Sequence, residues 1–174
     1  MDVAFQSFHQ ICGVVDFDGY SFHDTFHVRE MGWCDHSFTQ HYTYHYFIAS
    51  PYPKGDRKAC STIAYAYKHC HGLAYHPKYK CRKPARLEND FLKIYAQQPK
   101  DKPFVAYKGG HIEKDFLARL GVPAVDLEWF GCPKYDSIKD LSTIASCGHH
   151  RDCRKHHCPK AECACFMSWV KLRL

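Results

Sequence analysis

The chain has 174 residues, a hydrophobic content of 45% and a formal net charge of +6. This length suits one domain with a substantial core, and the hydrophobic content excludes an intrinsically disordered chain. No apolar run approaches the ~20 residues that a membrane-spanning helix needs, so we predict a protein without a membrane span. The positive charge suits contact with phosphate, yet it also suits mere solubility, so it assigns no partner by itself.

The sequence contains eleven cysteines, which is many for a domain of this size. Their odd number argues against a disulfide framework, and the N-terminus has neither the basic region nor the small-residue cleavage site of a secretory leader. We therefore expect an intracellular protein, in the cytoplasm or the nucleus, whose cysteines bind metal or fill the core.

The first third of the chain predicts three β-strands joined by short turns. Residues 11–17, 25–33 and 42–49 are rich in apolar and aromatic side chains, which are typical of strands. Pro51 and Pro53 end the third run. Consecutive strands with short connections predict an antiparallel meander.

The remaining two thirds alternate between helices and strands, with a polar, basic loop at 71–86. Apolar spacing predicts helices at 61–70, 87–98, 111–120, 135–145 and 159–169, and strands at 103–107 and 122–129. This order predicts a single α/β domain over residues 1–174, with a mixed β-sheet flanked by α-helices. The absence of a helix-stop signal at Leu174 is compatible with a fragment of a longer protein.

Four histidines and three cysteines lie within the twelve positions 147–158. Zinc takes four such ligands in a tetrahedron, and short spacings let one loop supply several of them. Cys147 and His150 form a C-x2-H pair, and Cys158 is a natural third ligand just before the last predicted helix. The segment therefore predicts a zinc site, although other members of the segment compete for the same positions: His149, Cys153 and His157.

A second set of candidates consists of acidic side chains. Asp16 and Asp18 are two residues apart at the end of a predicted strand, so both side chains lie on one face. Such pairs can bind Mg²⁺, although aspartate is also common where a strand turns. Glu113 and Glu162 both fall in the first turn of a predicted helix, where acids ordinarily interact with the helix dipole, and His157 precedes Glu162 by five residues.

The loop at 71–86 carries a cluster of cationic side chains interleaved with tyrosines. Basic and aromatic residues together can follow phosphates and stack on bases, which predicts a contact with nucleic acid. A solvated loop is the equally good alternative. The cationic candidates are Lys78, Lys80, Arg82, Lys83 and Arg86.

Three motifs resemble those of the DEDDh-type 3′–5′ exonucleases, which have an RNase H-like fold. Residues 14–18 (VVDFD) resemble the first motif with Asp in place of Glu, and residues 107–117 (YKGGHIEKDFL) are similar to the second with Glu in place of Asp. The spacing from His157 to Glu162 matches the third motif, again with Glu for Asp.

The exonuclease resemblance implies a centre that binds Mg²⁺ or Mn²⁺, with His157 as the general base. Three of the four acids differ from the family pattern, which implies a degenerate or weak centre. The implied metal ligands are Asp16, Asp18, Glu113 and Glu162.

A second resemblance is to the Maelstrom domain, an RNase H-like module linked to small-RNA silencing of transposons. Residues 29–32 (REMG), followed by residues 44–51 (YHYFIASP), are similar to its zinc-binding Glu motif and the aromatic strand after it. The Cys, His and His-Cys pattern before its last helix resembles Cys147, His150 and the pair that ends at Cys158. The resemblance implies a closed zinc set that includes Glu30, and a zinc with four protein ligands is structural.

We therefore expect a zinc-stabilised RNase H-like domain that binds nucleic acid, RNA in preference to DNA, with a degenerate or weak nuclease centre. The first alternative is an active Mg²⁺-dependent 3′–5′ exonuclease. The second alternative is a protein-interaction domain, which salt-sensitive binding of oligonucleotides would exclude.

Overall fold

The computed structural model describes residues 7–151 and 156–174. Cys153, one of the competing zinc ligands, lies outside the described residues. None of the helices in the described part of the chain is long and apolar enough to cross a membrane.

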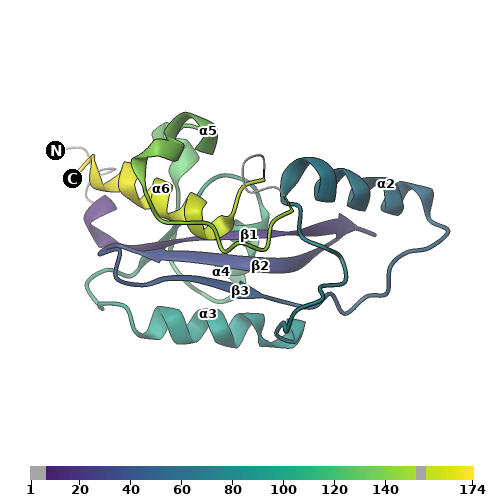
Figure 1. Cartoon of the computed structure of the whole chain (residues 1–174). Coiled ribbons are helices and arrows are strands. Elements are labelled where there is room, and N and C mark those ends of the chain that lie inside the picture. Colours follow the sequence, from purple (N-terminus) through teal and green to yellow (C-terminus); the bar gives the residue numbers. More distant parts are fainter. Residues whose placement is uncertain (1–6, 152–155) are drawn as a thin grey trace.

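A five-stranded mixed sheet with the order β3-β2-β1-β4-β5 forms the centre of the molecule (Figure 1). The first three strands are antiparallel neighbours: β1 (Ile11–Phe22), β2 (Thr25–Asp35) and β3 (His41–His45). The two later strands, β4 (Phe104–Tyr107) and β5 (Ala124–Asp126), run parallel to β1. This is the RNase H-like arrangement that the sequence predicted.

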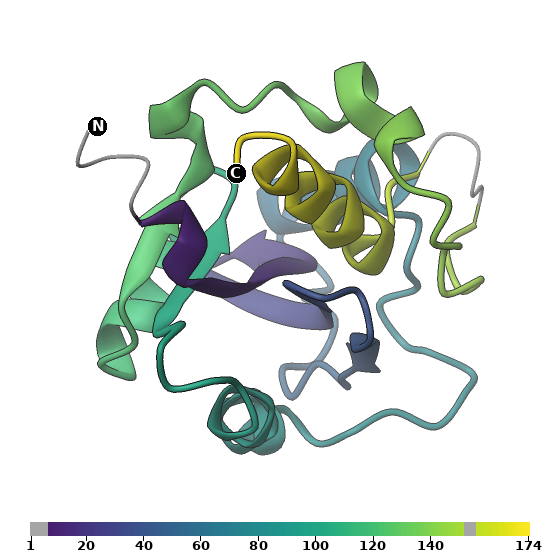
Figure 2. The same ribbon diagram turned by 90° about the vertical axis from the view of Figure 1, so that its left-hand side faces the viewer.

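Helices cover both faces of the sheet. On one face lie α2 (Arg57–Tyr65), α5 (Tyr135–Ile138) and α6 (Pro159–Lys171), and on the other lie α3 (Leu87–Ala96) and α4 (Ile112–Arg119). Figures 1 and 2 show α6 and α3 on opposite sides of the strands. The predicted mixed sheet flanked by helices is confirmed.

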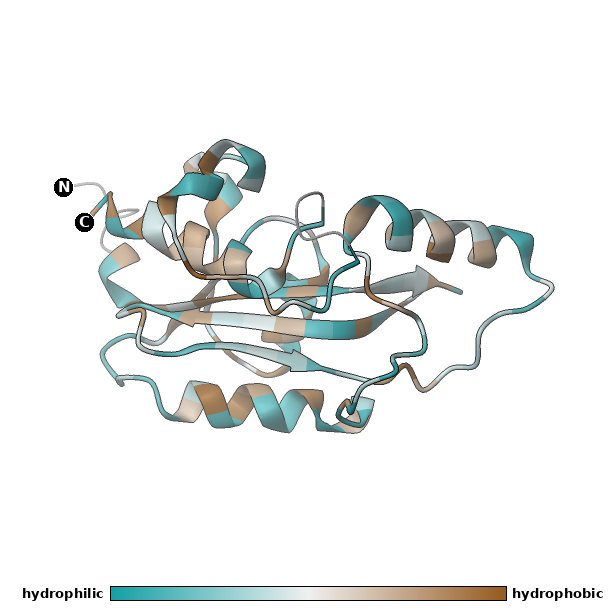
Figure 3. Cartoon of the chain, viewed as in Figure 1, coloured by the Kyte–Doolittle hydropathy of each residue, from teal (hydrophilic) through white to brown (hydrophobic). Residues whose placement is uncertain are grey.

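The period of two along β1 divides the core into two layers. Val14 packs in the layer under α6, whereas Val15 and Phe17 pack in the layer with α3 and α4. Hydrophobic and hydrophilic residues alternate along α3 (Figure 3), and Phe91 and Ile94 are its apolar residues buried against the sheet. By the same period, Asp16 and Asp18 of β1 face the α6 side.

Two helices and three strands differ from the prediction by three residues or more. β1, predicted to end at residue 17, continues to Phe22, so Asp16 and Asp18 lie within the strand and not at its end. Gly19 lies against the main chain of His27 in β2 and does not form a turn.

The strand predicted to reach residue 49 ends at His45, because Tyr46 turns to bridge Arg82. The helix predicted from residue 61 begins at Arg57, because the Asp56 carboxylate accepts a hydrogen bond from the Ala59 amide and caps it.

The later differences have local causes too. β5 stops at Asp126, whose carboxylate accepts from the Glu128 amide and starts a 3-10 turn, Leu127–Phe130. The helix predicted to reach residue 145 ends in a 3-10 turn at Leu141. The backbone of Ser142 is extended, and its hydroxyl accepts a hydrogen bond from the Ile144 amide. This local hydrogen bond competes with the backbone hydrogen bonds that would continue the helix.

Candidate metal centre and acidic pocket

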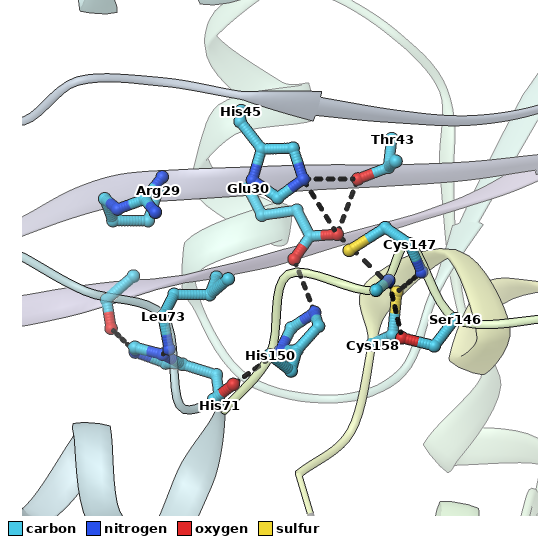
Figure 4. Close-up of polar contacts among 12 residues, drawn as sticks. Arg29, Glu30, Thr43, His45, His71, Leu73, Ser146, Cys147, His150 and Cys158 are labelled. Atoms are coloured by element: carbon cyan, nitrogen blue, oxygen red, sulfur yellow. Dashed lines mark hydrogen bonds and ion pairs between the residues drawn. The ribbon is translucent and has the colours of Figure 1, made fainter. Parts of the chain in front are cut away.

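Four predicted zinc ligands meet between the sheet and the segment before α6 (Figure 4). Glu30 comes from β2, Cys147 and His150 come from the preceding loop, and Cys158 is the N-cap residue of α6. One ligand atom from each lies within 4.8 Å of all the others. Glu30, His150 and Cys158 are buried, and Cys147 is half-buried. We call these four side chains the tetrad.

A β-bulge in β2 places Arg29 beside Glu30 of the tetrad. Asp18 of β1 pairs with Glu30, but the next residue of β1, Gly19, pairs with Val28, so Arg29 is the extra residue. Val28 and Met31 both pack in the layer with α3 and α4, although three positions separate them. The bulge thus lets two consecutive side chains, Arg29 and Glu30, lie on the same face, as Figure 4 shows.

The His150 ring is oriented by the main chain of the loop that follows α2. Its Nδ1 donates to the carbonyl oxygen of His71, and its Nε2 lies 2.8 Å from Oε2 of Glu30. His71 is itself held, since its Nε2 lies 2.9 Å from the Gly19 carbonyl oxygen and its Nδ1 accepts from the Leu73 amide. A histidine whose second nitrogen binds a carbonyl is the usual arrangement of a metal ligand.

The crowding of donors in the tetrad shifts their pKa values strongly. A hydrogen bond from the Cys147 thiol lowers the pKa of Cys158 to about 3 against the effect of burial, and the same bond with burial raises the pKa of Cys147. Burial lowers the pKa of His150, but hydrogen bonds to Cys158 and Glu30 outweigh it and raise that pKa to about 11. A protonated His150 ring therefore balances the Cys158 thiolate, and a metal cation that displaces this proton would be stabilised at the same place.

The donor chemistry of the tetrad fits zinc. Two sulfurs, one imidazole nitrogen and one carboxylate oxygen are the ligands that Zn²⁺ accepts, and four of them close its tetrahedral shell. In addition, the Cys147 amide points at Cys158 Sγ at 3.3 Å, and Thr43 Oγ1 donates to Glu30 Oε1 at 2.5 Å. These surrounding hydrogen bonds fix two of the ligands in place.

Three of the four predicted acids meet next to the tetrad, although Glu113 comes from α4 on the opposite face of the sheet. β4 pairs with β1 only as far as Val14. The amide of Phe17, three residues further along β1, therefore has no partner in β4 and donates to Glu113 Oε1 of α4 at 3.1 Å. Glu113 also hydrogen-bonds Asp16, which in turn hydrogen-bonds Glu162 in the first turn of α6.

Burial raises the pKa values of three of these carboxylates, and repulsion from neighbouring carboxylates raises them further. Burial and then the charge of Glu162 raise the pKa of Asp16 well above its ordinary value. The pKa of Asp18 rises through burial, Glu162 and Glu30, and burial raises that of Glu113. A bound divalent cation would relieve this repulsion, so the residues present fit a site for Mg²⁺ or Mn²⁺.

His157 lies between two carboxylates. Its Nδ1 is 2.9 Å from Glu162 Oε1, and its Nε2 is 3.0 Å from Asp136 Oδ1. The hydrogen bond with Glu162 raises the pKa of His157 despite partial burial. In this geometry both ring nitrogens face acceptors, which favours the protonated ring over the free base that the resemblance implies. Asp136, at the start of α5, was not anticipated, and no spacing in the sequence indicates it.

A pocket of about 360 Å³ opens over Asp16, His157 and Glu162. It lies at the carboxyl ends of the parallel strands β4 and β5, where open α/β sheets bind ligands. Lys108, which follows β4, is half-buried there and ion-pairs with Glu128 at 3.5 Å, and Lys134 is exposed. The pocket thus combines acids that suit a metal ion with ammonium groups that suit phosphate. We call it the acidic pocket.

The five cationic side chains of the 71–86 loop, predicted to contact nucleic acid, differ in their exposure to solvent. Arg82 makes two hydrogen bonds to the buried carboxylate of Asp90, at 2.6 and 2.8 Å, so its guanidinium is committed to the fold. The other four are exposed: Lys78, Lys80, Lys83 and Arg86. The structure therefore leaves four of the five in contact with solvent.

No family model matches the chain, and no curated protein matches it. Among solved structures, the chain is similar to the Mopeia virus exonuclease domain fully depleted of manganese, with a TM-score of 0.48 and 12% sequence identity. The alignment covers 98% of this chain and 86% of that chain. A likeness at this level assigns neither a family nor an activity, and the resemblance to the Maelstrom domain stays a prediction.

Proposed function

We propose that this chain is a zinc-stabilised RNase H-like domain that binds nucleic acid at the acidic pocket and retains only a weak nuclease centre there. The observation that carries the proposal is the pocket itself, where Asp16 and Glu162 face Lys108 and Lys134. Acids and lysines together suit a phosphodiester that is bound through a divalent cation. RNA as the preferred partner, and a role in silencing, rest on the Maelstrom-like motifs alone.

The tetrad would hold the structural zinc. Its ligands join the middle of β2 to the segment before α6, two regions 117 to 128 residues apart in sequence. A closed site of this kind contributes folding free energy, on the order of 10 kcal/mol in small zinc domains. Its four protein ligands leave no position for a reacting water.

The acidic pocket would hold Mg²⁺ or Mn²⁺ through Asp16 and Glu162, which line it, with Asp18 and Glu113 as the adjoining acids that would complete the site. Such an ion supplies Lewis-acid activation of a phosphate and of a water. The chain's own contribution is to place the phosphate by Lys108 and Lys134, and to hold a proton on His157 between Asp136 and Glu162. A protonated His157 is set up to donate to a leaving oxygen more readily than to take a proton from water.

A second candidate function is an active Mg²⁺-dependent 3′–5′ exonuclease. The observation that favours it is the hydrogen-bonded chain Glu113–Asp16–Glu162, because the fold gathers three acids that are distant in sequence. The substitutions of Asp18, Glu113 and Glu162 relative to the DEDDh pattern argue for the weak centre instead.

The test uses labelled single-stranded RNA and DNA with the zinc-loaded protein. Binding is followed by the fluorescence anisotropy of the labelled strand. We expect salt-dependent binding and slow or absent cleavage with Mg²⁺ or Mn²⁺.

Each outcome decides between the functions. Rapid Mg²⁺-dependent cleavage from the 3′ end that disappears in Asp16→Asn would establish the exonuclease. The absence of binding at low salt to either RNA or DNA would overturn both nucleic-acid functions and leave the protein-interaction domain.

A further inference from the structure

Arg29 is a fully buried arginine that has no carboxylate partner among the described residues. Its guanidinium donates to the carbonyl oxygens of Ala74 at 2.8 Å and Tyr46 at 3.1 Å, and to Tyr79 Oη at 2.9 Å. Within residues 7–151 and 156–174, no Asp or Glu oxygen lies within 4.0 Å of it. A buried charge is costly unless opposite charge lies nearby, so the position needs an anionic neighbour.

A chain of polar contacts connects this cation to the tetrad. Arginine has only donors, so Tyr79 Oη accepts from Arg29, and its own proton is directed to His45 Nδ1 at 2.8 Å. The His45 ring proton then sits on Nε2, which lies 3.4 Å from Thr43 Oγ1 and 3.8 Å from Glu30 Oε1. Thr43 donates to Glu30 Oε1. Every donor along the chain points from the arginine toward the carboxylate.

The charge of a zinc-loaded tetrad is the complement of Arg29. Glu30, Cys147 and Cys158 would bind as anions and His150 as a neutral ligand. Three negative ligands around a doubly charged ion leave one net negative charge in a buried site. Arg29 brings one positive charge to the same face of β2, through the bulge that places it beside Glu30.

The same contacts fasten the basic loop to the tetrad. Tyr79 lies between the exposed Lys78 and Lys80, and its ring stacks on His149 with centroids 4.0 Å apart, in the loop that carries the tetrad ligands. Arg29 also binds this loop at Ala74. The 71–82 segment thus reaches the tetrad through side chains and backbone rather than through helix or sheet.

We propose that Arg29 is a positioning residue of the zinc site: it balances the charge of the loaded tetrad and, through Tyr79, His45 and Thr43, holds Glu30 and the basic loop in place. This inference rests on the zinc site of the proposed function. It assigns to the loaded tetrad a second role, which is to fix the position of the Lys78 and Lys80 side chains.

The test measures zinc affinity by competition with a chromophoric chelator, and amide exchange of residues 71–82. Removal of a second-layer partner lowers metal affinity by about 10–100-fold, and we expect this loss in Arg29→Met, with faster exchange in the loop. Arg29→Lys keeps the charge but not the three hydrogen bonds, so its loss should be smaller. Tyr79→Phe keeps the stacking on His149 and removes only the hydroxyl, and should weaken zinc about tenfold or less.

Arg82→Met is the matched control, because Arg82 has its own carboxylate in Asp90. It should lower thermal stability without changing zinc affinity. If Arg29→Met fails to fold, the zinc affinities of Tyr79→Phe and Thr43→Val test the inference instead, and both should be lower than that of the wild type. Unchanged zinc affinity in Arg29→Met, or in both of these milder variants, would overturn the inference. A wild-type protein that binds no zinc would instead overturn the proposed zinc site.

Discussion

The tetrad and the acidic pocket are neighbours on one face of the sheet, yet they are built in opposite ways. The tetrad is buried and has soft donors that hydrogen-bond one another and the surrounding main chain. The acids supply only oxygen ligands, several have raised pKa values, and two of them, Asp16 and Glu162, line a pocket with two lysines. A closed set of metal ligands stabilises the fold. An open set of like charges destabilises the protein, and a bound divalent cation would offset that effect.

Two direct links join these regions. His157 and Cys158 are consecutive residues that belong to different centres, and Asp18 is the cross-strand partner of Glu30. A change in one centre is therefore expected to reach the other, and variants can measure how far each centre depends on its neighbour.

The largest expected effect is loss of the zinc site. Cys158→Ala, or removal of zinc by a strong chelator, should lower the free energy of unfolding by several kcal/mol and up to about 10 kcal/mol. Chemical denaturation followed by far-UV circular dichroism measures it. Cys70→Ala, which replaces an exposed thiol outside both centres, is the control. Equal stability of the zinc-free and zinc-loaded protein would contradict a structural role.

The next effect comes from the contact between β2 and α6. A Cβ at Gly32 would lie 2.3 Å from the main-chain carbon of Pro159, so Gly32→Ala must push the start of α6 away from the sheet. We expect a destabilisation of about 1–3 kcal/mol and weaker zinc binding, because Cys158 directly precedes this contact. Gly55→Ala, where nothing lies within 4 Å but φ is +86°, measures the cost of backbone strain without a clash and should leave zinc binding unchanged.

A smaller effect of opposite sign is expected in the acidic pocket. Asp16→Asn removes one of the repelling carboxylates, so without Mg²⁺ or Mn²⁺ it should raise the melting temperature by about 2–4 °C, which corresponds to about 1 kcal/mol in a domain of this size. Addition of Mg²⁺ should stabilise the wild type more than the variant. Scanning calorimetry with and without Mg²⁺ tests both statements, and a variant less stable than the wild type in both conditions would contradict them.

The smallest effect concerns phosphate binding. Lys134 is exposed at the acidic pocket, so Lys134→Ala should leave stability unchanged and reduce the salt dependence of oligonucleotide binding by about one phosphate contact. Fluorescence titration at several salt concentrations measures the slope. Lys100→Ala, an exposed lysine far along the chain from this pocket, should leave the slope unchanged.

The sequence predicted most of the fold, because helical spacing and strand composition are local properties. It predicted Cys147, His150 and Cys158 by spacing, since one short segment supplies them. Glu30 entered only through a resemblance, because pairing it with a segment more than a hundred residues away requires the folded sheet. The supporting side chains Thr43 and His71 carry no sequence signal, since a threonine or histidine in a strand or loop is ordinary.

The bulge in β2 has a consequence for how this strand can change. A regular strand sends neighbouring side chains to opposite sides, so without the extra residue Arg29 and Glu30 could not share an environment. Deletion of Arg29 would restore a regular strand in which Val28, Glu30 and Met31 keep their present faces, so Glu30 would stay in the tetrad and only the buried cation would be lost. The extra residue therefore serves the cation and not the ligand, and a relative without the bulge is expected to keep Glu30 but to lack a charge beside it.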